Sequence, residues 1–278
     1  MYLALALASA CLAGVWEFGT GHSGRRLSLY VVILVSASAA ILTYLSLGFA
    51  THNLEFDGRD VAAGLFGGFL NFLGTILLLK ALATGKMGVA SGVVPAYVLI
   101  PIAYSLMIGE SIGLLPAVGI VVILLGLVLF CLPRMLQRGT GGDSLTPIFL
   151  ALGTAGLFGL AVVVLDIGSR TNIYGTLTLA QCPQVIVTGM IVVAARRYRG
   201  TSTRDISVLV GSGVALGLSN LSFYAAAVEG NVGVVSVLGS LSPVATALLA
   251  FFILKEAMLR AEVLALLVVL IGTALVLD

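Results

Sequence analysis

The chain is a succession of apolar runs, each separated from the next by a short polar or glycine-rich connection. A run of about 20 residues is what a helix needs to cross about 30 Å of hydrocarbon at a rise of 1.5 Å per residue. The runs are apolar on every face, whereas the strands of a membrane barrel alternate over about 10 residues. The pattern predicts ten helices, near residues 2–22, 29–50, 61–84, 88–109, 113–132, 146–167, 174–195, 206–228, 232–254 and 260–277.

Composition leads to the same fold class. Of 278 residues, 60% are hydrophobic and 9% are charged, and the mean hydropathy is +1.17. Average globular chains carry about 25% charged residues, so a soluble enzyme, a nucleic-acid-binding module and a disordered tail are excluded. We expect an all-α membrane protein with ten transmembrane helices, passing several times through a bacterial inner (plasma) membrane and surrounded by lipid.

The two halves of the sequence resemble one another. The longest polar connection, residues 133–145, separates a five-helix repeat at 1–132 from a second at 146–278. At a constant shift of 145, five residues of the first half fall on identical residues of the second: Arg25 on Arg170, Gly85 on Gly230, Gly88 on Gly233, Val89 on Val234 and Ser91 on Ser236. An odd number of helices makes a tandem copy enter the membrane in the opposite sense. The sequence therefore predicts two inverted five-helix repeats, the plan of secondary transporters, with a substrate site near the midplane.

Basic residues predict the orientation of the chain, because cytoplasmic loops carry an excess of lysine and arginine. The side of the two termini carries Arg59 and Arg170. The opposite side carries eleven basic residues: Arg25, Arg26, Lys86, Arg134, Arg138, Arg196, Arg197, Arg199, Arg204, Lys255 and Arg260. Both termini are therefore predicted to be non-cytoplasmic.

Three segments resemble the EamA-type branch of the drug/metabolite transporter superfamily. They are residues 80–90 (KALATGKMGVA), the pair Gly109–Glu110, and residues 241–256. The resemblance extends over nearly the whole chain and is strongest over residues 206–276. It implies ten helices, two inverted repeats and export of small metabolites. Residues 13–19 (AGVWEFG) are also similar to the first helix of small multidrug resistance proteins, which carry a membrane glutamate.

Glu17 is the candidate coupling residue. Among the twelve acidic residues it alone is predicted to lie inside a helix, and the others are expected in loops or at helix ends. A carboxylate in hydrocarbon costs about 2.5 kcal/mol or more, so it is typical of a functional position. Its neighbours at three and four residues are small, which leaves space for a proton, another ion or a cationic group. The alternative interpretation is a helix-end carboxylate that pairs with His22, Arg25 or Arg26.

Further polar residues in the predicted helices are candidates for substrate binding, since an amide, phenol or hydroxyl in lipid needs a partner. The set is Trp16, Asn71, Tyr97, Gln181, Gln184, Asn220, Tyr224 and Ser240. Pro95, Pro101, Pro183 and Pro243 interrupt the fourth, seventh and ninth helices, where bends could be hinges or fixed. Lys80 and His22 are secondary candidates, with snorkelling to the surface and a loop position as their alternatives.

The sequence contains no P-loop, no HExxH motif and no nucleophile elbow, and its three cysteines share no CxxC spacing. We therefore expect neither an enzyme nor a metal or cofactor. The function predicted is a secondary active transporter of small polar metabolites such as amino acids or organic cations, an exporter by alternating access with proton coupling through Glu17. An uncoupled facilitator or uptake carrier is the alternative, and a membrane scaffold subunit is the alternative of another class. The nearly nonpolar fifth and tenth helices suit contact with lipid or a second copy, so a monomer and a homodimer both remain open.

Overall fold

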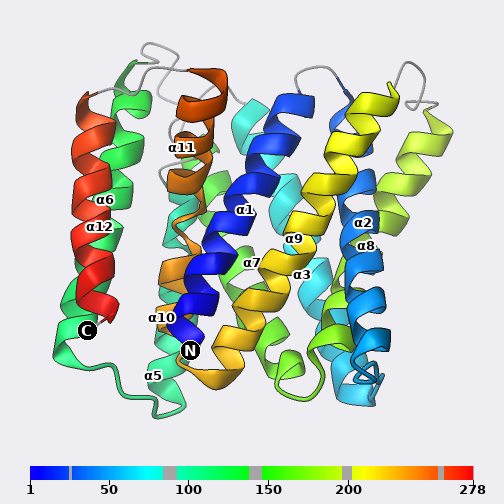
Figure 1. The fold of residues 1–278 in the computed structure, drawn as a ribbon, viewed down its shortest axis with the longest axis horizontal. Helices are drawn as coiled ribbons and strands as arrows, with labels where there is room; N and C mark the ends of the chain where they lie inside the picture. The colour runs from blue at the N-terminus through cyan, green and yellow to red at the C-terminus, as the bar shows by residue number, and fades with distance from the viewer. Residues whose placement is uncertain (25–26, 84–92, 138–145, 196–201, 256–259, 278) are drawn as a thin grey trace.

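The computed structural model describes residues 1–24, 27–83, 93–137, 146–195, 202–255 and 260–277. Within these ranges all regular elements are helices (Figure 1), which confirms the predicted fold class. Helices satisfy every backbone hydrogen bond within one segment, and a membrane provides no water to replace such bonds. The connections at 84–92 and 138–145, where part of the predicted fourth helix and most of the predicted linker fall, lie outside the described residues.

The helices correspond closely to the predicted runs. They are α1 (Tyr2–Gly24), α2 (Leu29–Ala50), α3 (Gly58–Ala83), η1 (Val94–Val98), α5 (Leu99–Met107), α6 (Leu114–Gln137), α7 (Thr146–Ser169), α8 (Ile173–Ala194), α9 (Thr203–Glu229), α10 (Val232–Gly239), α11 (Ser242–Leu254) and α12 (Arg260–Leu277). With η1 and α5 counted as one crossing, and α10 and α11 as another, the described residues form ten. Seven of these are long and apolar enough to span a membrane, and Val94–Met107, Leu114–Leu129 and Val263–Val276 are shorter apolar helices.

The two halves interlock as inverted repeats. Both termini lie at one side of the bundle (Figure 1), called here the terminal side, and the second half begins at the opposite, far side. The first helix of the first half, α1, packs against α9, α10 and α11 of the second. The first helix of the second half, α7, packs in the same way against α3, η1 and α5 of the first. Each repeat thus contributes to the environment of the other.

The ninth predicted helix is not continuous, and this corrects the prediction of one helix over 232–254. It is divided into α10 and α11 by a turn at Ser240 and Leu241, with Pro243 in the first turn of α11. Proline has no N–H to donate and its ring clashes with the preceding turn, so a helix ends before it more readily than it continues. In α8, by contrast, Pro183 lies inside an unbroken helix.

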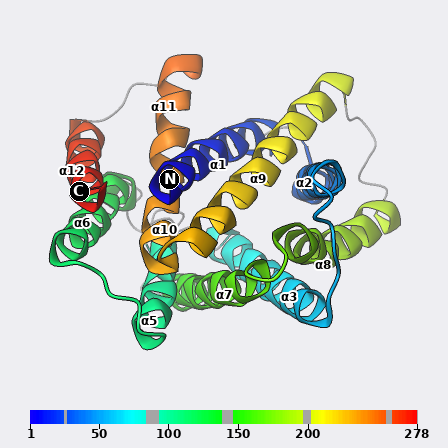
Figure 2. The same cartoon turned by 60° about the horizontal axis from the view of Figure 1, so that its bottom comes forward.

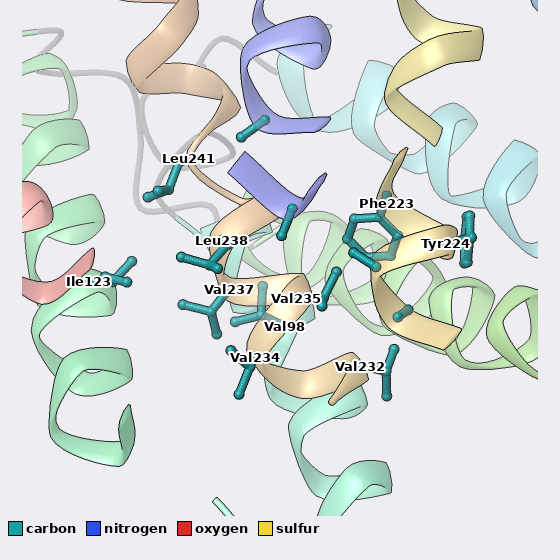
Figure 3. Close-up of a cluster of buried hydrophobic side chains, with 14 of the residues drawn as sticks. Val98, Ile123, Phe223, Tyr224, Val232, Val234, Val235, Val237, Leu238 and Leu241 are labelled. Carbon is teal, nitrogen blue, oxygen red and sulfur yellow. The ribbon is translucent and has the colours of Figure 1, made fainter. Parts of the chain in front are cut away.

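The main apolar core surrounds α10. Every residue of Val232–Leu238 is buried, and the cluster adds buried side chains from α1, α6 and α9 (Figure 3). Its buried members come from the terminal-side half and the middle of the bundle. Close van der Waals contact, rather than exclusion of water, holds helices together in lipid. The part of the bundle around α10, between the terminal side and the α10–α11 break, is therefore tightly packed.

Helices α6 and α12 pair with each other at one end of the bundle (Figure 2). Their backbones approach closely, since a Cβ on Gly272 would lie 2.9 Å from the carbonyl oxygen of Gly119. Their outward faces expose large apolar side chains, among them Leu125 and Leu264. This pair is placed to contact lipid and lies apart from the polar residues described below.

Candidate functional site

Glu17 lies inside α1, seven residues before its end at Gly24, which is about 10 Å along the helix axis. Its side chain is partly buried, and both carboxylate oxygens accept a hydrogen bond from α11. The Ser242 hydroxyl donates to Oε1 over 2.6 Å, and the Thr246 hydroxyl donates to Oε2 over 2.7 Å. These distances are in the range of hydrogen bonds to a charged acceptor.

The break in the ninth crossing explains why these two donors meet one carboxylate. It places the first turn of α11 in the middle of the crossing, and Ser242 and Thr246 are four residues apart on one helix face. Thr246 also lies 3.3 Å from the carbonyl oxygen of Gly14 and 3.0 Å from that of Ser242, but its single hydrogen has the Glu17 carboxylate as nearest acceptor. Gly14 permits this approach, because a Cβ there would lie 2.5 Å from the Cβ of Ala245.

Two aromatic candidates accompany Glu17. Tyr97, on η1, interacts electrostatically with the Glu17 carboxylate. Trp16 precedes Glu17 in α1, and its Nε1 is buried with no hydrogen-bond partner among the described residues. A buried indole N–H usually has an acceptor, so this nitrogen is available to a bound group.

The amide candidates form a second group around a residue absent from the predicted set, Tyr44. Asn220 Nδ2 donates to the hydroxyl of Tyr44 over 2.9 Å, and Gln181 is also hydrogen-bonded to this phenol. Gln184 Nε2 donates to Gln181 Oε1 over 3.1 Å. Tyr44 is fully buried, so these bonds link α2, α8 and α9 inside the bundle.

Tyr224 connects the two groups. It is buried on α9 beside Phe223, with ring centroids 5.0 Å apart and the rings edge to face (Figure 3). It interacts electrostatically with both Tyr44 and Tyr97. Hydrogen bonds or electrostatic interactions therefore link five of the eight predicted substrate-binding residues, Tyr97, Gln181, Gln184, Asn220 and Tyr224, and Trp16 precedes Glu17 on α1.

The remaining candidates lie elsewhere. Ser240 is buried at the end of α10, where its hydroxyl donates to the carbonyl of Val237 over 2.7 Å. Asn71, Lys80 and His22 are exposed. No described basic side chain forms an ion pair with Glu17 in this structure. The hypothesis that His22 or Lys80 pairs with Glu17 therefore has no supporting contact among the described residues.

Two further acidic residues lie inside helices, although the sequence predicts them in loops or at helix ends. Asp166 lies within α7 and Asp60 within the first turn of α3, and both side chains are fully buried. This corrects the expectation that Glu17 alone lies in a helix. The predicted third helix begins at residue 61, just after Asp60, whereas α3 begins at Gly58. The predicted sixth helix ends at residue 167, which puts Asp166 at a helix end, whereas α7 continues to Ser169. Thr246 could have been found from its spacing of four residues after Ser242.

The arrangement provides a carboxylate, an unpaired indole N–H, phenols and amides between the two repeats. Together they suit a small molecule with an amino or other cationic group beside polar groups. Among the described residues, no cluster of three or more His, Cys, Asp or Glu side chains is arranged to hold a metal ion. The fold is that of an integral membrane protein with ten helical crossings.

Residues 145–278 match the EamA-like transporter family. The protein is a membrane transporter of the drug/metabolite type, as the sequence resemblance implied. One crystal structure of another protein has the same fold with a TM-score of 0.82 and 16% identity, covering 99% of this chain and 95% of that chain. At this identity the likeness extends to the fold alone. No curated protein matches the sequence.

Proposed function

We propose that this protein is a secondary active transporter that exports a small polar metabolite, such as an amino acid or an organic cation, with proton coupling at Glu17. The observation that carries the proposal is the pair of hydrogen bonds from Ser242 and Thr246 to the Glu17 carboxylate. This contact joins the first helix of one repeat to the broken helix of the other. Alternating access requires that such a contact change between states.

The state of the Glu17 carboxylate bears directly on this contact. Two hydroxyl donors favour a charged acceptor, and a proton on the carboxylate occupies one of the accepting oxygens. A cationic substrate group would compete with the proton for the same charge. Since no described basic side chain is paired with Glu17, its charge is available to either ligand.

The substrate would lie between Glu17 and the group around Tyr44. In this proposal an amino or cationic group binds Glu17, and Trp16 and Tyr97 contact the adjoining part of the molecule. Gln181, Gln184, Asn220 and Tyr224 then meet its polar end. Asn71, which is exposed, and Ser240, whose hydroxyl donates to Val237, remain proposed members of a different conformation. This division suits a solute that is polar at both ends.

Orientation follows from charge. The terminal side presents the acidic residues Glu55, Asp57 and Glu229 with few basic ones, and the far side carries eleven basic residues in the sequence. By the excess of basic residues in cytoplasmic loops, we propose that the terminal side faces away from the cytoplasm of a bacterial inner membrane. Glu17 lies nearer the far side, where it would meet a cytoplasmic substrate first.

An uncoupled facilitator or uptake carrier is the second candidate. It is favoured by the fact that both Glu17 oxygens already have a partner, as in a carboxylate that only stabilises packing. The two candidates differ in whether neutralising Glu17 abolishes proton movement.

The deciding experiment uses purified protein in liposomes with a trapped pH dye and a panel of amino acids and organic cations. We expect the wild type to give a substrate-dependent pH signal and Glu17→Gln to give none, with the same amount of folded protein. The matched control is Glu229→Gln, an exposed carboxylate at the end of α9, which should behave as wild type. Equal substrate movement without a pH signal in both proteins would establish the facilitator, and no movement of any compound would favour a scaffold.

A further inference from the structure

Asp166 belongs to a second polar cluster, on the terminal side of the bundle. Its Oδ2 accepts a hydrogen bond from Arg170 Nε over 2.9 Å, one helix turn further along the chain. The other end of the Arg170 guanidinium lies 3.4 Å from Glu110 Oε1, beyond the end of α5. Ser105 donates to Glu110 Oε2 over 2.5 Å. The cluster thus links α7 of the second repeat to α5 of the first.

The charges in this cluster do not balance. Two carboxylates, Asp166 and Glu110, share one guanidinium, which leaves one negative charge in excess. Partial burial lowers the pKa of Arg170, but the hydrogen bond and charge of Asp166, with Glu110 adding to them, outweigh this and raise that pKa above its ordinary value. Arg170 therefore stays positive, and the excess charge belongs to the carboxylates.

Of the two carboxylates, Asp166 has the fewer partners to compensate the excess negative charge. Its side chain is 0% exposed, and its Oδ1 has no hydrogen-bond partner among the described residues. Glu110, in contrast, is 24% exposed and has partners for both oxygens. A buried carboxylate oxygen without a donor is costly, so the site favours whatever positive ligand reaches it. Because Asp166 is fully buried, that ligand has to be very small.

The groups that interact electrostatically with Asp166 come from three helices. They are Arg170 just after α7, Tyr104 on α5 with Glu110 just after that helix, and Tyr224 on α9. Tyr224 in turn interacts with Tyr97, which interacts with Glu17. Glu17 on α1 and Asp166 on α7 are thus connected through the electrostatic interactions of Tyr97 and Tyr224. Each repeat contributes one of the two acids.

We propose that Asp166 is a second proton-binding site of this transporter, on the terminal side. A proton from solvent binds Asp166 Oδ1, no other bond breaks, and the cluster becomes neutral, with Arg170 and Glu110 as a balanced pair. Loss of the proton restores the excess charge. The link between α5 and α7 would then depend on protonation, as the link between α1 and α11 depends on Glu17. The role in a transport cycle rests on the proposed function, but proton binding itself does not.

Infrared difference spectroscopy during a pH titration of the purified protein in lipid tests this directly, without substrate. A protonated acid gives a C=O stretch that a carboxylate lacks. We expect a band from a buried acid that shifts on ¹³C labelling of aspartate, which separates it from Glu17, and that is lost in Asp166→Asn. The matched control is Asp60→Asn, also a buried aspartate with an unpartnered oxygen, but one at the first turn of α3, where the helix end stabilises its charge. That variant should keep the band.

If Asp166→Asn does not fold, the same titration is carried out on Asp60→Asn protein with ¹³C-labelled aspartate. In that variant Asp166 is the one fully buried aspartate among the described residues, so a labelled band has to come from it. Persistence of the labelled band supports the site. Absence of the labelled band, or an unchanged band in Asp166→Asn, overturns the proposed proton site at Asp166. The liposome experiment is independent: the infrared band with no transport refutes only the proposed function, and transport with no band refutes only the second site.

Discussion

The Thr246 hydroxyl lies 2.7 Å from a carboxylate oxygen of Glu17, although 229 residues separate the two in the chain. The bond runs from the N-terminal part of α11, just after the break, to α1, which is continuous. It therefore links the two repeats next to the break in the ninth crossing. A change in the charge of Glu17 therefore acts on the contact between α1 and α11 beside this break.

Thr246 and Glu17 should be energetically coupled. A double-mutant cycle of Glu17→Gln and Thr246→Val removes the charged acceptor and the donor separately and together. We expect a coupling of about 1.5–3 kcal/mol in the free energy of unfolding, the range for a hydrogen bond to a charged group. Denaturant titration in lipid–detergent mixtures measures it. The control pairs Glu17→Gln with Thr75→Val, a hydroxyl that bonds within α3, and should be additive. Additivity in the first pair would show that the contact contributes nothing.

Gly14 should be required for this contact. A side chain there meets Ala245 and the backbone nitrogen of Thr246, so Gly14→Val forces α11 away from α1. Overpacking of this kind costs about 1–3 kcal/mol, and we expect a lower melting temperature together with loss of the substrate-dependent pH signal. Gly21→Val is the control in the same helix, because a Cβ at Gly21 has no neighbour within 4 Å. Wild-type melting and transport in Gly14→Val would contradict the geometry described for Glu17.

The orientation prediction is tested with reporters fused to the C-terminus. Because the terminal side carries the fewer basic residues, we expect alkaline phosphatase fused there to be active outside the cytoplasm. Green fluorescent protein at the same position, which reports the cytoplasm, should remain dark. A bright fluorescent fusion with an inactive phosphatase reverses the orientation, and it also reverses the side from which Glu17 is first reached.

Much of the fold could be predicted from the sequence because the requirement of each helix is local. A run of apolar residues long enough to span the membrane forms its hydrogen bonds within itself. Apart from the start of the fourth run and the end of the fifth, the predicted ends lie within three residues of those that the structure describes. Glu17 was recognisable for the same reason, since a carboxylate in an apolar run is costly wherever the helix packs. Asp166 was missed because it lies near a helix end, where sequence alone does not separate a buried acid from a loop residue.

The partners of these acids depended on long-range packing. The sequence by itself determined that the chain is a ten-helix membrane protein of two inverted halves and that Glu17 is its most unusual charge. Only the tertiary structure decided that Glu17 meets Ser242 and Thr246, that Tyr44 holds Asn220 and Gln181, and that Arg170 serves both Asp166 and Glu110. Helices in lipid associate through shape and a few polar contacts, and the residues that meet in this way carry no common spacing along the chain.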